Sequence, residues 1–296
     1  MLGHLALVGE DIKNFKEAGV PLNDIGFTRG VVVCTAIEAY KGILFHEEKH
    51  KKRLLESAGA ARMPIEKARG FEKLFQNLSR LAVKSRFRES VTYVYITGGS
   101  GSGGLKAGGR PNIYAFTVKE TRKNKPMAVA TTHNYWRSLP GIKSTFYLPG
   151  YIALTDAGWP DDVIYIDHAT NEVLESVTKN IFVVRRDAQL QTPPIHGKIL
   201  NGITHQIFLG IAREDKEYRE LSGPPVFPCV EEASIKFGDL MKDALGGEVT
   251  GVVLASTTTV APVGSINGIK MPISRKTKDF CEQFLRYREA YYVKYK

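Results

Sequence analysis

Residues 42–54 contain the change of pattern that decides the fold of the first part of the chain: Gly42-Ile43-Leu44-Phe45-His46-Glu47-Glu48-Lys49-His50-Lys51-Lys52-Arg53-Leu54. After the turn at Gly42, residues 43–45 are apolar and predict an extended segment. Residues 47–58 place apolar side chains on one face at helical spacing, and Gly59 is a typical helix end. Upstream, residues 31–35 are rich in β-branched side chains and predict a buried strand. This region therefore combines strands with a helix.

Strands and helices mix along the remaining chain without a regular βαβ period. Apolar runs predict further strands at residues 5–8, 90–97, 112–118, 127–132, 163–166, 181–184 and 252–255. Helical patterns occur at residues 64–83, 147–157, 202–214 and 277–290. This irregular mixture favours an α+β fold over a doubly wound sheet. The polar, basic stretch 119–126 is the best linker candidate, and we place the interdomain linker at residues 121–130, between an N-terminal α/β domain (residues 1–120) and a C-terminal domain (residues 131–296).

Composition limits the classes of partner. The 296 residues include 41 Lys and Arg against 31 Asp and Glu, a net charge of 41 − 31 = +10. The basic residues are dispersed, and zinc-finger, basic-zipper and RNP aromatic patterns are absent from the sequence, so nucleic acid is not an expected partner. No run approaches the ~20 apolar residues that span a bilayer, so a membrane is not expected either.

The cysteines and the N-terminus indicate a compartment. Cys34, Cys229 and Cys281 are an odd number at wide spacing, which argues against a disulfide framework or a zinc site. The first ten residues lack a basic n-region, so a signal peptide is not expected. We therefore expect a reducing, cytoplasmic location and no metal.

Lys143 is the first candidate for chemistry. It lies between the turn residues Pro140 and Gly141 and the aromatic segment 146–148, an unusual place for a surface charge. Burial disfavours the ammonium form, as a Schiff-base lysine requires. A lysine that snorkels to solvent is the alternative.

Three further segments could bind an anionic or heteroaromatic ligand. Glu175, at the end of a strand-like stretch, could hold a protonated ring nitrogen, as in pyridoxal phosphate (PLP) chemistry. Residues 201–204 precede a helix, whose first amides form a natural phosphate site, and Thr204 is a candidate for its first turn. Residues 256–259 add hydroxyl groups after a strand. A surface glutamate, a capped helix or a polar turn would explain each segment alone.

Together, in this order and spacing, these segments resemble the class IV aminotransferases: branched-chain aminotransferase, D-amino acid aminotransferase and aminodeoxychorismate lyase. Residues 42–54 look like the G-x-x-F-x-x-x-x-H-x-x-R-L helix of that family, and the likeness extends from residues 24–30 to 262–263. The resemblance implies a two-lobe fold type IV enzyme with a smaller N-terminal lobe and a larger PLP-anchoring C-terminal lobe. It also implies a homodimer.

The resemblance also implies roles for single residues. It assigns Lys143 as the Schiff-base lysine and proton shuttle, Glu175 as the partner of the pyridine nitrogen, and Tyr147 as the partner of the phenolic oxygen. The PLP phosphate would be held by the side chain of Arg53, the backbone amides of Ile203 and Thr204, and the hydroxyls of Ser256 and Thr257. An arginine, amides and hydroxyls neutralise a dianion by charge-assisted hydrogen bonds.

The substrate side departs from the known subfamilies. Residues 30–35 replace a G-D-G-x-[FY]-E segment, so that Cys34 and Thr35 stand where an aromatic residue and a glutamate are expected. A glycine-rich loop, residues 98–104, takes the place of the R-x-H carboxylate trap of D-amino acid enzymes. Candidates for substrate binding are Arg29, Cys34 and Lys106. A structural cysteine, and a salt bridge or dimer contact for Arg29, are the alternatives.

The leading hypothesis is therefore a PLP-dependent aminotransferase acting between a small amino acid, D or branched-chain L, and a 2-keto acid. The first alternative is 4-amino-4-deoxychorismate lyase, of the p-aminobenzoate and folate pathway. The lyase motif R-G-S-G-x-R-G-Y has glycines, Gly98 and Gly103, at both arginine positions here, which argues against this assignment. The second alternative is a non-catalytic basic binding protein on the same fold.

Overall fold

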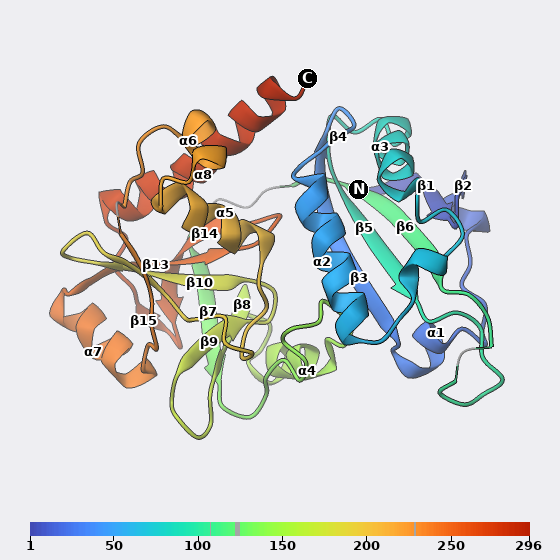
Figure 1. Ribbon diagram of the computed structural model, residues 1–296. Coiled ribbons are helices and arrows are strands. Elements are labelled where there is room, and N and C mark those ends of the chain that lie inside the picture. Colours follow the sequence, from blue (N-terminus) through green and yellow to red (C-terminus); the bar gives the residue numbers. More distant parts are fainter. Residues whose placement is uncertain (107, 122–124, 228) are drawn as a thin grey trace. The chain divides into compact units, whose positions relative to one another are not determined.

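The computed structural model describes residues 1–106, 108–121, 125–227 and 229–296 (Figure 1). The chain forms two compact units. Unit 1 contains Met1–Thr121, Ile142–Phe146 and Tyr295–Lys296, and unit 2 contains Arg122–Gly141 and Tyr147–Lys294. The short segment around Lys143 thus belongs to unit 1, although the residues before and after it belong to unit 2.

Unit 1 is built on a six-stranded antiparallel sheet with the strand order β2-β1-β6-β5-β3-β4. Its strands are β1 (Leu2–Val8), β2 (Asp11–Asn14), β3 (Val32–Tyr40), β4 (Ile43–Leu44), β5 (Glu89–Thr97) and β6 (Asn112–Lys119). Its helices are α1 (Ile25–Arg29), α2 (Glu47–Ala60) and α3 (Leu74–Lys84), with 3-10 turns η1 (Phe15–Glu17) and η2 (Ile65–Lys67).

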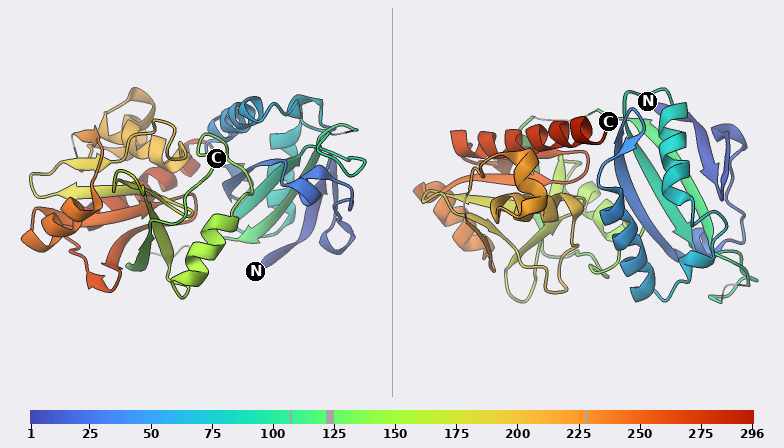
Figure 2. Two further views of the ribbon diagram at one scale, coloured as in Figure 1. Left: turned by 90° about the horizontal axis from the view of Figure 1, so that it is seen from below. Right: turned by 45° about the horizontal axis from the view of Figure 1, so that its top comes forward.

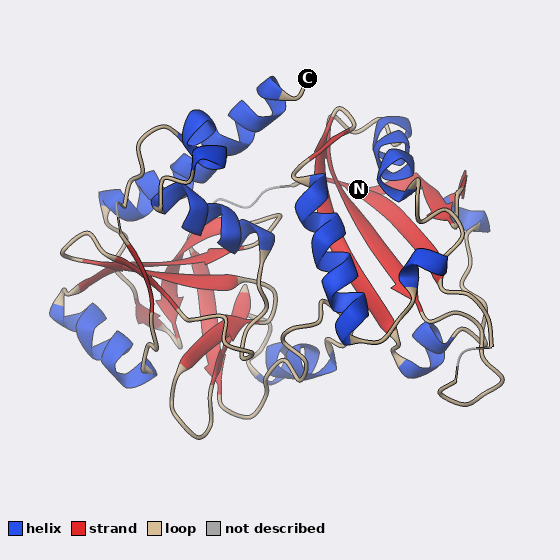
Figure 3. Ribbon diagram, in the orientation of Figure 1, coloured by secondary structure: helices blue, strands red, loops and turns tan. Residues whose placement is uncertain are grey.

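Helices α2 and α3 cover one face of this sheet (Figure 3). Leu54 of α2 and Leu78 of α3 pack with Val33 and Ile37 of β3 in one buried apolar cluster. Strand β3 pairs with β5 without interruption along its whole length. The predicted strand at residues 31–35 and the predicted helix after Gly42 are therefore confirmed, and α2 is fixed on β3.

The single helix predicted over residues 64–83 is wrong. The segment begins with η2, and α3 begins only at Leu74. Gly70 lies between them with φ +85°, and a Cβ there would come within 2.9 Å of the Cβ of Glu10. This left-handed turn, packed against another segment, interrupts the helix, and the helical spacing of apolar residues does not reveal it.

Unit 2 is built on a nine-stranded mixed sheet with the order β12-β11-β10-β13-β14-β7-β8-β9, and β15 pairs with β14. Its strands are β7 (Met127–Thr132), β8 (Asp162–Ile166), β9 (Val173–Ser176), β10 (Asn180–Arg185), β11 (Leu190–Thr192), β12 (Val230–Glu232), β13 (Val249–Ala255), β14 (Val260–Ile266) and β15 (Ile269–Lys270). Its helices are α4 (Leu148–Asp156), α5 (Ile203–Ala212), α6 (Lys216–Ser222), α7 (Phe237–Gly246) and α8 (Arg275–Lys294).

An aromatic cluster joins helices α5 and α8 to the sheet of unit 2. Phe182 of β10 contacts the ring of Phe208 in α5 and that of Phe280 in α8, and Phe208 also contacts Phe284 of α8. The long helix α8 is seen in red in Figure 2. No helix in the described parts of the chain is long and apolar enough to cross a membrane.

Both units combine helices with antiparallel or mixed sheets, so the predicted α+β class is confirmed. The predicted linker, 121–130, includes residues 122–124, which lie outside the described residues. A division of the chain at that linker would place Ile142–Phe146 in the C-terminal domain, but in the structure this segment belongs to unit 1. The reason is an antiparallel bridge between Val33 of β3 and Ser144.

Candidate active site

The peptide groups of Lys143 are fixed in unit 1. Its backbone N–H donates to Oγ of Ser57 at 3.1 Å, and its carbonyl accepts from the backbone N–H of Cys34 at 2.8 Å. Ser57 lies in α2 and Cys34 in β3, so one helix and one strand hold the lysine from both sides of its Cα. Its position is therefore set by residues far away in the sequence.

The face of α2 toward Lys143 is buried and polar. His46, immediately before the helix, and His50, Arg53 and Ser57 within it follow one another at helical spacing, and all four are buried. Arg53 is only 9% exposed. Its Nη2 donates to Oγ1 of Thr35 in β3 at 2.8 Å, and that oxygen lies 2.7 Å from Nδ1 of His50. We call the side chains of His46, His50, Arg53, Ser57 and Thr35 the polar layer between α2 and β3. Lys143 is bonded to this layer through Ser57.

The two histidines of this layer are neutral near pH 7. Burial lowers the pKa of His46 to about 3, with a further contribution from Lys49. Burial, followed by the charges of Arg53 and other neighbours, holds the pKa of His50 well below its usual value. The histidines therefore add no positive charge to the layer, and the guanidinium of Arg53 is the group in it that suits the binding of an anion.

In unit 2, Glu175 forms a buried ion pair that the sequence analysis did not identify. Nε of Arg137 donates to Oε1 of Glu175 at 2.7 Å, and the two side chains are 8% and 3% exposed. Nη2 of Arg137 donates to the carbonyl of Val177 at 3.2 Å, and the guanidinium lies 5.4 Å from the ring centroid of Tyr147. Arg137 therefore links Glu175 to Tyr147, two of the predicted site residues.

The electrostatics of Arg137 follow from these neighbours. Burial alone would lower the pKa of Arg137, but the carboxylate of Glu175 and the phenol of Tyr147 hold it above its usual value. The weak signal in the sequence was an arginine six positions before Lys143, between the apolar residues Trp136 and Leu139. Nothing in that pattern connects it to Glu175, which lies 38 residues away.

The N-terminus of α5 lies beside the start of β10. Nδ2 of Asn180 donates to the carbonyl of Leu200 at 2.9 Å, and a Cβ at Gly202 would come within 2.1 Å of Oδ1 of Asn180. Gly202 is the N-cap, and no side chain in the described residues caps this helix. Ile203 and Thr204, both buried, form its first turn. Their amides are thus available to an anion.

The hydroxyl residues Ser256 and Thr257 follow directly after β13. Asn180 pairs with Ala255 across the β10–β13 ladder, so the turn 256–259 begins next to the strand that positions α5. The structure therefore brings four of the predicted phosphate ligands to one end of unit 2: Ile203, Thr204, Ser256 and Thr257. Arg53, the fifth, lies in unit 1.

The three substrate-binding candidates differ in their exposure to solvent. Cys34 is buried in β3 and holds the carbonyl of Lys143. Arg29 is exposed at the end of α1, where it donates to the carbonyl of Thr28 at 2.8 Å and to that of Gly103 at 2.7 Å. Lys106 is exposed in the same glycine-rich region. Arg29 thus binds the loop itself.

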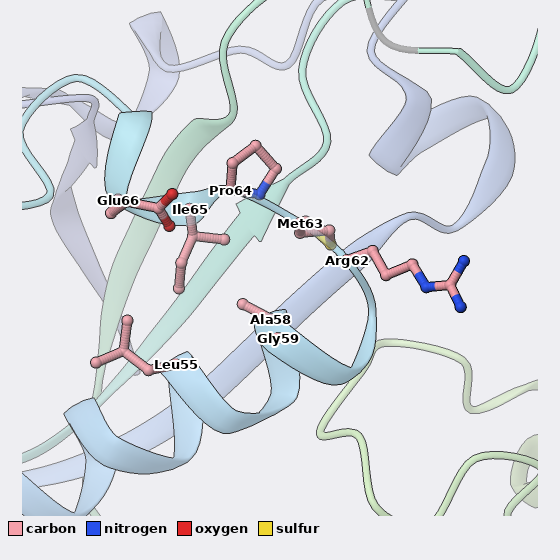
Figure 4. A pocket seen from close by; sticks show the side chains of 8 residues that line it. All are labelled: Leu55, Ala58, Gly59, Arg62, Met63, Pro64, Ile65 and Glu66. Carbon is pink, nitrogen blue, oxygen red and sulfur yellow. The ribbon is translucent and has the colours of Figure 1, made fainter.

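Unit 1 also has an open pocket at the C-terminal end of α2 (Figure 4). Its lining residues are Leu55, Ala58, Gly59, Arg62, Met63, Pro64, Ile65 and Glu66. None of them was predicted to bind the cofactor or the substrate, and we assign no function to this pocket.

Comparison with known proteins identifies the family. Residues 33–266 match the family model for amino-transferase class IV. The chain belongs to the class IV aminotransferases. This aminotransferase is 26% identical over 219 residues to a putative branched-chain-amino-acid aminotransferase of Methanocaldococcus jannaschii, which covers 68% of this chain and 72% of that protein. A D-alanine aminotransferase of Staphylococcus aureus is 26% identical over 283 residues, 91% of this chain and 93% of the relative.

Solved structures share the fold of this aminotransferase. A branched-chain aminotransferase of Thermoproteus uzoniensis, solved with norvaline, has a TM-score of 0.81 and 21% identity and covers 97% of this chain and 96% of its own. A putative 4-amino-4-deoxychorismate lyase of Legionella pneumophila has a TM-score of 0.77 and 20% identity, with 93% and 97% covered. This chain thus shares its fold with a branched-chain aminotransferase and with a putative lyase.

As a class IV aminotransferase, the chain is a PLP-dependent enzyme. The groups in each unit fit that cofactor. Unit 1 has a buried guanidinium, Arg53, in the polar layer, and Lys143, whose backbone N–H donates to Ser57 of that layer. Unit 2 has a buried carboxylate, Glu175, and the uncapped first turn of α5. These are the donors and acceptors that a phosphate dianion, an aldehyde and a pyridine nitrogen require.

Proposed function

We propose that this enzyme transfers the amino group of a small amino acid, either a D-amino acid or a branched-chain L-amino acid, to a 2-keto acid. Relatives named for branched-chain amino acids and for D-alanine support this choice of substrates. The observation that carries the proposal is the anchoring of Lys143. Both of its peptide groups are bonded to unit 1, and one of them to Ser57, one helical turn from Arg53.

In this proposal Lys143 carries PLP and acts as the acid and base. PLP supplies an electron sink that stabilises negative charge at the α-carbon of the substrate. Once the substrate amino group has replaced it on the cofactor, the free amine of Lys143 would accept the α-proton and then donate it to the cofactor carbon that Lys143 had occupied, which is general acid–base catalysis by a positioned amine. The hydrogen bonds from Cys34 and to Ser57 keep the Cα of Lys143 in place during this transfer.

Other residues hold the cofactor. The carboxylate of Glu175 binds the proton on the ring nitrogen, and Arg137, by binding Oε1 of Glu175, keeps this carboxylate oriented. Tyr147, beside Arg137, binds the phenolic oxygen. The phosphate is bound by the guanidinium of Arg53, the amides of Ile203 and Thr204, and the hydroxyls of Ser256 and Thr257. We further propose that Arg29, Cys34 and Lys106 contribute to substrate binding.

We also propose that the enzyme is a homodimer in a reducing cytoplasm. Exposed apolar side chains on and beside α4 support a protein interface: Leu148, Tyr151 and Trp159. No disulfide occurs among the described residues, and two of the cysteines are buried. Sedimentation analysis of the purified protein tests the dimer.

A donor screen tests the reaction. Both enantiomers of alanine, glutamate and leucine are offered with 2-oxoglutarate or pyruvate, and the new keto acid is measured. We expect turnover that depends on the acceptor and prefers one enantiomer. Release of pyruvate from aminodeoxychorismate without any acceptor would favour the lyase instead. Protein that shows no visible cofactor band after PLP is added would contradict both enzyme hypotheses.

A further inference from the structure

Thr35 occupies the centre of the polar layer between α2 and β3. It lies in β3, opposite Val94 of β5, and is 2% exposed. A buried hydroxyl needs hydrogen-bond partners, because an unsatisfied one destabilises the fold. Thr35 has two: Nη2 of Arg53 at 2.8 Å and Nδ1 of His50 at 2.7 Å.

The direction of both hydrogen bonds follows from the chemistry of the groups. A guanidinium only donates, so the Thr35 oxygen accepts from Arg53. The Thr35 hydroxyl must then donate its own proton to another group. Among the described residues, Nδ1 of His50 is the acceptor within hydrogen-bond distance. Nδ1 is therefore unprotonated, and the neutral imidazole carries its proton on Nε2. The chain of donors runs from Arg53 through Thr35 to His50.

We propose that Thr35 is a positioning residue for the cofactor: its hydroxyl orients the guanidinium of Arg53 toward the phosphate and holds His50 as the neutral Nε2–H tautomer. This inference rests on the proposed role of Arg53. The arginine side chain has many rotamers, and holding it in one of them costs conformational entropy. A hydrogen bond made before the cofactor arrives places that cost in folding rather than in binding.

The neutral state of His50 has a second consequence. A cationic imidazole next to Arg53 would repel the guanidinium and would need its own anion in a buried place. Burial holds the pKa of His50 well below its usual value, which agrees with the neutral state that the hydrogen bonds imply. Thr35 thus keeps His50 uncharged beside the guanidinium of Arg53 that it positions.

The test compares the affinity of the protein for PLP with that for pyridoxal, which lacks the phosphate. Thr35→Val removes the hydroxyl and keeps the branched shape. We expect Thr35→Val to weaken PLP binding roughly tenfold, as for the loss of a hydrogen bond to a charged group, and to leave pyridoxal binding unchanged. Thr35→Ser should restore PLP binding. Both dissociation constants are measured by spectroscopic titration of cofactor-free protein.

Thr92→Val is the matched control. Thr92 is fully buried in β5 of the same sheet, and its hydroxyl bonds Oγ1 of Thr117 in β6 rather than a member of the polar layer. This variant should bind PLP and pyridoxal like the wild type. Equal loss of both ligands in Thr35→Val, or unchanged PLP binding, would overturn the positioning role. A wild-type protein that binds no PLP would instead refute the proposed function.

A measurement on the wild type avoids any folding defect of the variant. Nitrogen-15 NMR of histidine-labelled protein distinguishes the two imidazole tautomers. We expect His50 to carry its proton on Nε2 at neutral pH. A proton on Nδ1 would reverse the hydrogen bond to Thr35 and contradict the inference.

Discussion

Replacing Arg137 by methionine removes the cation beside Glu175 while it retains much of the apolar stem. The ion pair is buried, with the two side chains 8% and 3% exposed, so solvent does little to screen it. Removing one partner of a buried pair costs about 3–5 kcal/mol, because the other charge remains without compensation. The lost hydrogen bond to the carbonyl of Val177 adds roughly 1 kcal/mol. We therefore expect the free energy of unfolding to fall by about 4–6 kcal/mol.

The assay is urea unfolding of cofactor-free protein, followed by intrinsic fluorescence. Glu175→Gln alone should also destabilise, since it leaves the guanidinium buried. The double variant Arg137→Met with Glu175→Gln should recover at least about 2 kcal/mol relative to the sum of the single changes. Arg69→Met is the matched control, because its ion pair with Glu10 is exposed. It should leave the urea midpoint nearly unchanged.

The result that would refute this reasoning is a small and additive effect. If Arg137→Met costs less than about 1 kcal/mol, and the double variant loses the sum of both single changes, Glu175 does not depend on Arg137. Its orientation toward the cofactor would then need another source.

Two further predictions concern the N-terminus of α5 and the buried histidines. Gly202→Ala should lower stability by about 1–3 kcal/mol and weaken PLP binding, because a Cβ would lie 2.1 Å from Oδ1 of Asn180. Gly246→Ala is the control, because the space around Gly246 is open. Equal effects of the two substitutions would contradict the prediction. Burial lowers the pKa of His46 to about 3 and the pKa of His205 to about 4 in the folded protein. In the unfolded chain both histidines keep a pKa of about 6.5, so the unfolded chain binds protons first as the pH falls. The free energy of unfolding should therefore fall between pH 6.5 and 4, with a slope that approaches about 1.4 kcal/mol per pH unit for each histidine. His205→Gln should reduce this slope. A flat profile between pH 6.5 and 5 would contradict the prediction.

The sequence predicted the local elements around the site and not their contacts. The β-branched run in β3 and the helical spacing in α2 are local patterns, and both elements formed as expected. The position of Lys143 depends on Ser57, 86 residues earlier in the chain, and on a backbone N–H of β3. Both bonds are made by the backbone of Lys143 and so leave no mark on its residue type; only the structure assigns the lysine to unit 1.

Strand β14 illustrates a second reason. It was not predicted, because Pro262 and Gly264 weaken its strand pattern. In the structure Pro262 pairs with Val253 of β13, and the pairing with β7 shifts between Val263 and Ser265, around the glycine. An irregularity of this kind accommodates residues that are poor strand formers, and tertiary packing rather than propensity then decides the element.

The central claim is that Lys143 carries the cofactor. The direct measurement is borohydride reduction of the PLP-loaded enzyme, followed by proteolysis and mass spectrometry of the modified peptide. We predict that the reduced pyridoxyl group is found on Lys143, in the peptide that contains residues 140–148, and that Lys143→Ala protein shows neither this adduct nor the visible cofactor band. A stable adduct on another lysine, or near-full activity of Lys143→Ala, would contradict the account.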